Sequence, residues 1–304
     1  MNPPEDFDPP AGQAQTLAPG LQRILAPNPS AMTWRGTNTY LVGTRNLAVI
    51  DPGPSDPAHL QAIVNSLRPG QSISHILVTH AHLDHSPLAA DLARETGAPI
   101  LAYGDALAGR SAVMQGLADS GLAGGGEGVD HSFRCDIALA DGACVQGDGW
   151  QITAHWTPGH FGNHLAFQWG DAVFSGDLVM GWASSLVSPP DGDLTQFMAS
   201  CAKLRALNAR ILHAGHGAPV TRPSARIDWL IAHRNARETA ILQALAQGPA
   251  TAQALARSIY TETPPALLPA ATRNVFAHLV DLTGKNRVQP QGSLAYTAVF
   301  KTIS

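Results

Sequence analysis

The stretch His80-Ala81-His82-Leu83-Asp84-His85 brings three imidazoles and one carboxylate into six residues. The apolar run Ile76-Leu77-Val78 before it predicts the end of a strand, and Ser86-Pro87 after it predicts the start of a helix. A tight turn can point neighbouring side chains at one spot, whereas a straight helix or strand cannot do so for all four. Imidazole suits zinc and carboxylate widens the choice to iron or manganese, so the turn predicts a metal site.

Length and composition predict a globular protein with a substantial core. The chain has 304 residues, of which 44% are hydrophobic and 14% charged, enough for one large domain or two smaller ones. Its three cysteines form no CxxC motif, which favours a reducing, cytoplasmic compartment. The acidic, proline-rich start at residues 1–6 lacks the features of a signal peptide. No apolar run approaches the roughly 18 residues that span a membrane, so no membrane partner is expected.

The order of apolar segments predicts an α/β (α+β) fold. Strands are expected at residues 21–25, 39–42, 46–50, 73–79 and 99–103, with helices at 57–67 and 88–96. This alternation favours a mixed sheet over a purely parallel one.

A second unit is predicted after Pro223. Three helical stretches are followed there by a strand pair, 288–289 and 295–299, around Gly292, which is the pattern of a winged helix. We therefore place a catalytic domain at residues 1–222 and a winged-helix domain at residues 223–304.

Three later residues are also candidate ligands. His160, Asp177 and His216 each follow a glycine and each comes just after a predicted strand. If the strands lie side by side, these strand ends share one edge of the sheet with the histidine turn, and sites on α/β folds collect at such edges. The residues alone give seven candidate ligands and do not divide them between ions.

At these residues the chain resembles the metallo-β-lactamase-fold superfamily. Besides the histidine turn, the matching pieces are Thr157-Pro158-Gly159-His160, Ser175-Gly176-Asp177 and Gly215-His216-Gly217, in the family's order. The resemblance covers about residues 20–220 and implies a four-layer αββα sandwich. It also implies a division of the ligands: one ion on His80, His82 and His160, a second on Asp84, His85 and His216, and Asp177 between them.

Further segments resemble one branch of the superfamily. These are residues 37–42, residues 185–193 and the winged helix. The branch includes β-lactamase-like protein 2, a mitochondrial endoribonuclease for single-stranded RNA, and many bacterial relatives of unknown substrate. Pro87 and Phe161 stand where Gly and Thr are common. Neither is a ligand, so these departures bear on the shape of the pocket.

The ligand set predicts hydrolysis. Two divalent cations, with zinc preferred over iron or manganese, bring about +4, and Asp84, Asp177 and a hydroxide bring about −3. The net charge of about +1 lowers the pKa of metal-bound water from about 15.7 toward about 7. The sequence therefore predicts that a metal-bound hydroxide cleaves an ester, thioester, lactone or related bond. Asp84 has a second predicted role, as catalytic acceptor of the proton.

Four other residues are expected near the site. Asp51 either orients a ligand histidine or caps a turn. His164 either holds a polar group near the pocket or is a structural histidine, and the second interpretation is favoured. Trp182 and Ser185 either line the substrate mouth or pack a loop.

Charge distribution separates the possible partners. Residues 222–304 hold nine Lys/Arg and four Asp/Glu, whereas residues 1–221 hold ten and nineteen. The acidic catalytic half favours a small-molecule substrate. The alternative is a single-stranded RNA endonuclease whose winged helix contacts phosphates through basic residues: Arg222, Arg226, Arg234, Arg237, Arg273, Lys285 and Arg287.

Two lesser alternatives are a mononuclear iron dioxygenase and a non-enzymatic DNA-binding module. The dioxygenase shares the histidine turn. The complete set of seven ligands counts against the binding module. A homodimer is left open by the sequence.

Overall fold

The first of two facing sheets carries the histidine turn. The computed structural model describes residues 7–303, so the interpretation of residues 1–6 lies outside it. The strands of this sheet lie side by side in chain order: β1 (Gln15–Ala18), β2 (Leu21–Leu25), β3 (Asn38–Val42), β4 (Asn46–Ile50), β5 (Ser72–Leu77), β6 (Ile100–Ala102) and β7 (Ile137–Ala138). Pairing is antiparallel from β1 to β4 and parallel from β4 to β7, which confirms the predicted mixed sheet.

The second sheet brings the later ligand candidates to the same edge. Its order is β12-β11-β10-β9-β8, and its strands are β8 (Cys144–Gln146), β9 (Gln151–Trp156), β10 (Leu165–Trp169), β11 (Ala172–Gly176) and β12 (Ile211–Ala214). β11 and β12 run parallel, so Asp177 and His216 both follow strand ends that point the same way. His160 lies in the connection from β9 to its antiparallel neighbour β10.

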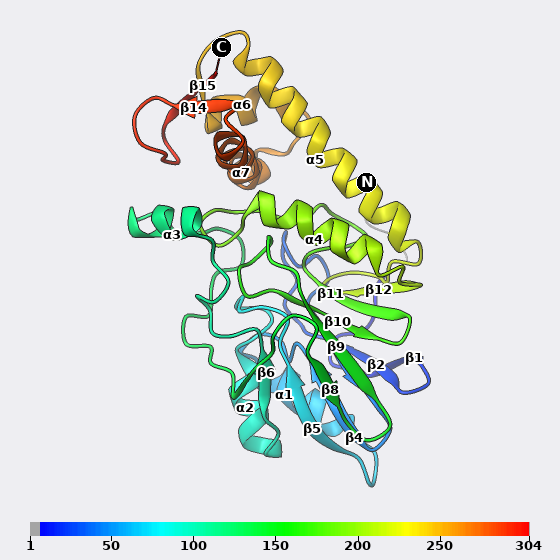
Figure 1. The fold of residues 1–304 in the computed structure, drawn as a ribbon. Helices are drawn as coiled ribbons and strands as arrows, with labels where there is room; N and C mark the ends of the chain where they lie inside the picture. The colour runs from blue at the N-terminus through cyan, green and yellow to red at the C-terminus, as the bar shows by residue number, and fades with distance from the viewer. Residues whose placement is uncertain (1–6, 304) are drawn as a thin grey trace.

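Helices cover the outer face of each sheet, which confirms the αββα sandwich (Figure 1). α1 (Pro57–Asn65) and α2 (Leu88–Thr96) share an apolar core with the first sheet, through residues such as Ile63, Ile76 and Leu92. α4 (Leu194–Ala206) and α5 (Pro223–Leu245) share a core with the second sheet. A third core, which includes Phe167 and Phe174, fills the space between the sheets. Full burial of each such side chain contributes about 1.5–3 kcal/mol.

The C-terminal part forms a winged helix, as predicted. Its elements are β13 (Ala250–Thr251), α6 (Ala252–Ile259), the 3-10 turn η1 (Pro265–Leu267), α7 (Leu268–Gly284), β14 (Val288–Pro290) and β15 (Val299–Thr302). The three strands pair in the order β13-β15-β14. The strand expected at residues 295–299 is wrong, because β15 begins only at Val299. Tyr296 instead packs its ring 5.3 Å from the ring of Phe276.

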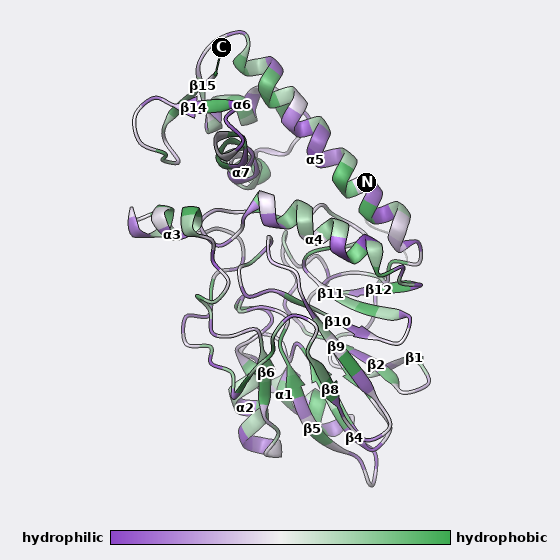
Figure 2. Cartoon of the chain, viewed as in Figure 1, coloured by the Kyte–Doolittle hydropathy of each residue, from purple (hydrophilic) through white to green (hydrophobic). Residues whose placement is uncertain are grey.

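The long helix α5 belongs to two cores. It begins at Pro223, and its first half places Ile227 and Leu230 in the core of the second sheet. Its second half places Ile241 and Leu245 in the core of the winged helix. Figure 2 shows apolar and polar residues alternating along its length, as a helix with contacts at both ends requires. The boundary at residue 222 stays a prediction.

α3 (Ala112–Asp119) lies apart from these layers and contacts the winged-helix core through Met114 and Leu117. Among residues 7–303, no helix is long and apolar enough to cross a membrane.

Candidate metal centre

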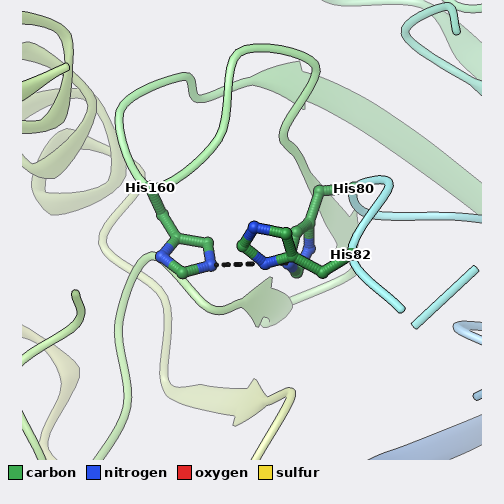
Figure 3. Close-up of side chains that lie close together, drawn as sticks. All are labelled: His80, His82 and His160. Carbon is green, nitrogen blue, oxygen red and sulfur yellow. Dashed lines mark hydrogen bonds between the residues drawn. The ribbon is translucent and has the colours of Figure 1, made fainter. Parts of the chain in front are cut away.

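Three histidines form the first ligand group. His80 and His82 come from the turn after β5, and His160 comes from the connection between β9 and β10 (Figure 3). The Nδ1 atom of His82 lies 2.9 Å from Nε2 of His80 and 3.1 Å from Nε2 of His160. All three side chains are buried, so three ring nitrogens from two separate segments converge on one spot.

Two carboxylates and two histidines form the second group. Nε2 of His216 lies 3.1 Å from Oδ2 of Asp84 and 3.1 Å from Oδ2 of Asp177. Nε2 of His85 lies 3.5 Å from a carboxylate oxygen of each of the same aspartates. Asp177 also lies 3.7 Å from Nε2 of His160, so it connects the two groups. The structure therefore brings together all seven predicted ligands.

Hydrogen bonds orient four of the five imidazoles. In each of the four, Nδ1 faces an oxygen outside the ligand set and Nε2 faces the centre. Because a ring N–H held in this way fixes the tautomer, Nε2 is left as the electron-pair donor that a metal requires. The partners are Thr79 Oγ1 for His80, Asp51 Oδ2 for His85, the Leu186 carbonyl for His160 and the Gly36 carbonyl for His216.

Buried atoms of the second group lack partners within the described chain. They are Asp84 Oδ1, Asp177 Oδ1 and His85 Nε2. An unsatisfied buried polar atom costs about 1–3 kcal/mol, and more when it is charged. His85 Nε2 lies 3.5 Å from Asp177 Oδ1, and a divalent cation held by this group would satisfy such buried atoms. The residues present thus fit a pair of metal ions.

Protonation separates the two groups. Burial, reinforced by the neighbouring His160, lowers the pKa of His82 to about 3, and burial lowers the pKa of His80 well below its usual value. These imidazoles are neutral, the form that binds metal. For His216, burial lowers the pKa, but Asp177 and Asp84 outweigh it and raise the pKa to about 10. The imidazolium of His216 thus balances carboxylates that a cation would otherwise neutralise.

Glycines allow the ligands to approach one another. A Cβ on Gly215 would lie 2.3 Å from Asp177 Oδ1 and 2.7 Å from Cε1 of His85. Gly176 has a φ of +47°, and a Cβ there would lie 2.5 Å from His164 Nε2. Only glycine fits at these two positions without displacing the site. The Gly-ligand pairs seen in the sequence therefore have a steric cause.

Asp51 and His164 support the ligands. Oδ2 of Asp51 lies 2.9 Å from Nδ1 of His85, and the carboxylate accepts hydrogen bonds from the amide and hydroxyl of Thr79. Asp51 has a φ of +52°, a conformation uncommon outside glycine and found at functional sites. His164 is fully buried between the Thr157 hydroxyl and the backbone N–H of Asp177. It is a structural histidine that holds Asp177.

Trp182 lines the cavity above the ligands, whereas Ser185 does not. The cavity has a volume of about 270 Å³, and its floor is formed by five of the seven ligands: His82, Asp84, His160, Asp177 and His216. Of the two interpretations of Ser185, the structure supports loop packing, because its side chain is fully buried and donates to the Leu178 carbonyl.

Sequence reasoning missed two residues that position ligand segments, Asn163 at the histidine turn and Asn38 beside His216. Asn163 is fully buried; its Oδ1 accepts from the backbone N–H of Ala81, and its Nδ2 donates to the Asp105 carbonyl. Asn38 donates to the carbonyls on either side of His216, those of Ala214 and Gly217. For Asn38 the available signal was an asparagine at the start of an apolar strand, and such a residue does not reveal its partner.

The proposed phosphate footprint is corrected at two positions. Arg226 and Arg234 are buried, and their guanidinium groups donate to backbone carbonyls of residues 180–185. Arg234 also donates to Asn274 of the winged helix at 2.9 Å. These arginines hold the two parts of the chain together and do not present charge to a polyanion.

The fold and the two ligand groups are those of a metal-dependent hydrolase. Residues 32–216 match the family described as the Metallo-beta-lactamase superfamily, and residues 251–296 match the Beta-lactamase associated winged helix domain. The chain belongs to the metallo-beta-lactamase superfamily and carries its associated winged helix.

Relatives resemble the chain over most of its length. It is 33% identical over 288 residues to the beta-lactamase-like protein 2 homolog of Drosophila melanogaster, covering 90% of this chain and 91% of that protein. It is 28% identical over 269 residues to an atrochrysone carboxyl ACP thioesterase of Aspergillus fumigatus, covering 83% and 77%. A beta-lactamase domain protein from Burkholderia ambifaria has the same fold, with a TM-score of 0.81, 21% identity and coverage of 98% and 96%.

Proposed function

We propose that the protein is a dinuclear hydrolase, with zinc as the preferred metal, that cleaves an ester, thioester or lactone. The observation that carries this proposal is the pair of adjoining buried ligand groups at the floor of one cavity. A mononuclear dioxygenase would use one group only, and a DNA-binding module would use neither. The completeness of the second group, which includes Asp84 and His216, therefore favours hydrolysis over both.

Each ligand group has its own task in this proposal. His80, His82 and His160 would hold one ion, and Asp84, His85 and His216 the other, with Asp177 between them. Such a pair of ions lowers the pKa of water and polarises a carbonyl oxygen. Asp51 and Thr79 keep the ligand imidazoles in the required tautomer and orientation.

Asp84 has a second task, to accept the proton of the attacking water. Its Oδ1 is buried without a partner, and the residue lines the cavity. Burial raises the pKa of Asp84, but the neighbouring His85 and His216 outweigh it and hold the pKa below its usual value, so the carboxylate is ionised before the reaction.

The lining of the cavity supports an uncharged acyl substrate. No lysine or arginine is among the lining residues, and most of the lining is apolar, with Met32, Met180, Leu186 and Leu267 among its side chains. A nucleic-acid backbone is usually bound through lysine and arginine contacts to its phosphates, and this lining offers none. Similarity to a protein named as a thioesterase agrees with acyl transfer to water.

The RNA alternative has less support. Of its seven basic residues, Arg226 and Arg234 are buried and Lys285 is paired with Asp281 at 2.6 Å. RNA as a partner, the homodimer and the cytoplasmic location stay predictions.

A substrate panel on protein of known metal content tests the proposal. The panel is a nitrophenyl ester, an acyl thioester, a lactone, a bis-nitrophenyl phosphate and a single-stranded RNA. We expect two metal ions per chain and turnover of an acyl substrate. His82→Ala and Asp177→Ala should each abolish activity and reduce the metal content by at least one ion per chain. His155→Ala, which removes an imidazole hydrogen-bonded to Gln168 and outside the cavity lining, is the matched control. Acyl hydrolysis by metal-free protein would refute the proposal.

A further inference from the structure

The outer wall of the cavity comes from the winged helix. While the ligands form the floor, the C-terminal part contributes a wall between the end of α6 and the middle of α7. It is formed by Tyr260, Thr263, Leu267, Ala270, Ala271 and Asn274. The cavity therefore exists only when the two parts of the chain are packed together.

Hydrogen bonds fix this wall relative to the ligands. Asn274 Oδ1 accepts from the backbone N–H of Val187, and Arg273 donates to the Pro189 carbonyl at 3.0 Å. The same loop supplies the Leu186 carbonyl that faces Nδ1 of His160 at 2.8 Å. The loop at residues 186–189 thus connects the wall to a metal ligand and holds the wall at a fixed distance from the metal centre.

The wall is uncharged. Its six residues include three apolar side chains and no ionised one, and Met32, Met180 and Leu186 line the same cavity. Away from the metal ligands, the charged residues of the lining are two acids, Glu127 and Asp191, of which Asp191 is paired with Arg110 at 2.8 Å. A neutral apolar chain is stabilised by such surroundings, and a polyanion is repelled.

One buried hydroxyl in the lining lacks a partner among the described residues. Ser188 is 4% exposed, and its Oγ forms no hydrogen bond with any described residue. It lies beside Gly125, where a Cβ would approach Oγ to 3.3 Å. A buried hydroxyl without a partner costs about 1–3 kcal/mol, so a ligand oxygen within reach would be stabilised there.

We infer that residues 260–271 of the winged helix select the acyl group of the substrate. The cavity takes the acyl portion of a neutral ester or thioester, a mainly apolar chain that carries an oxygen within reach of Ser188. This inference rests on the proposed function and specifies its substrate class. It also gives the winged helix a role other than binding nucleic acid.

Two matched pairs of variants test the wall with butanoyl, octanoyl and dodecanoyl thioesters. Ala270→Phe adds bulk inside the cavity, whereas Ala266→Phe adds the same bulk at an exposed position of η1. Leu267→Ala opens the cavity, whereas Leu268→Ala alters a neighbour that lines a different pocket. Because one methylene changes selectivity by about tenfold or more, Ala270→Phe should lower kcat/KM for the longest chain at least tenfold relative to the shortest. Leu267→Ala should shift the preference toward the longest chain.

A third variant tests the hydroxyl. Ser188→Ala should lower kcat/KM for a β-keto acyl thioester more than for the plain acyl thioester of the same length, and Ser188→Thr should restore the difference. Equal losses for the two substrates would refute the contact with Ser188.

The outcomes distinguish this inference from the proposed function. No acyl hydrolysis by the wild-type protein with two metal ions would refute the proposed function itself. Hydrolysis with the wild-type chain-length profile in both Ala270→Phe and Leu267→Ala would refute only the role of the wall. If Ala270→Phe does not fold, as judged by circular dichroism and metal content, Leu267→Ala decides alone. RNA cleavage that Ala270→Phe blocks while acyl hydrolysis is untouched would refute the substrate class.

Discussion

Gly215→Ala tests whether close approach of the second ligand group controls catalysis. The new methyl would lie 2.3 Å from Asp177 Oδ1 and 2.7 Å from His85 Cε1, and contacts under 3.0 Å are essentially never seen. The backbone cannot easily retreat, because the Gly215 N–H donates to the Gly176 carbonyl and the Gly215 carbonyl accepts from Asn38. Asp177 must therefore move by about 0.7 Å, and a displacement near 1 Å costs about 100-fold in rate.

A 100-fold loss corresponds to about 2.7 kcal/mol of transition-state stabilisation. We expect kcat/KM on the best acyl substrate of the panel to fall by about that factor. The metal content after dialysis should fall from two ions to one, because His80, His82 and His160 are not touched by the methyl. Inductively coupled plasma mass spectrometry gives the metal content, and initial rates give kcat/KM.

Gly116→Ala is the matched control. Gly116 lies in α3 with nothing within 4 Å of the position of a Cβ. It should keep two ions and wild-type activity, and should gain about 0.5–1 kcal/mol of stability from reduced backbone entropy in the unfolded chain. Two tightly bound ions together with wild-type kcat/KM in Gly215→Ala would refute the steric reasoning.

Three further perturbations have defined outcomes. Asp51→Asn keeps the shape of the side chain and tolerates the positive φ, but it removes the carboxylate from His85. Chelator competition should therefore show that the second ion binds about 10–100-fold more weakly, while the affinity for the first ion is unchanged. Equal weakening of both ions would contradict this. Arg234→Met should lower the free energy of unfolding, measured in urea, by about 2 kcal/mol or more, because the Ser185 carbonyl and the Asn274 amide oxygen lose a buried donor. Substitution of an exposed arginine, Arg257→Met, should change it by less than about 0.5 kcal/mol. Burial, with a smaller effect of nearby arginines, lowers the pKa of His213 to about 4, compared with about 6.5 in the unfolded chain. The free energy of unfolding of the metal-free protein should therefore fall by about 3 kcal/mol on account of this residue as the pH falls from about 6.5 to about 4. His213→Phe should remove that part of the pH dependence, and an unchanged acid transition would count against a neutral, buried imidazole.

The sequence determined the chemistry of this protein to a large extent. Ligand residue types, their place after apolar strands and the glycines beside them are local features. The glycines before Asp177 and His216 are visible in the sequence, but the crowding that requires them comes from residues distant in the chain: His164 for Gly176, and His85 and Asp177 for Gly215. The strand and helix periods were equally local, so the αββα order followed from them together with the family resemblance.

Only the tertiary structure shows what the residues outside the ligand set contact. Arg234 and Ser185 are polar in the sequence and buried in the fold, where the Arg234 guanidinium on α5 donates to the Ser185 carbonyl and to Asn274 of the winged helix. Tyr260 and Leu267 come from the winged helix yet line the cavity above the metal ligands. A hydropathy pattern predicts which apolar side chains are buried, but it shows neither which polar side chains are buried nor what any side chain contacts. Contacts between segments about a hundred residues apart therefore became visible only once the chain was folded.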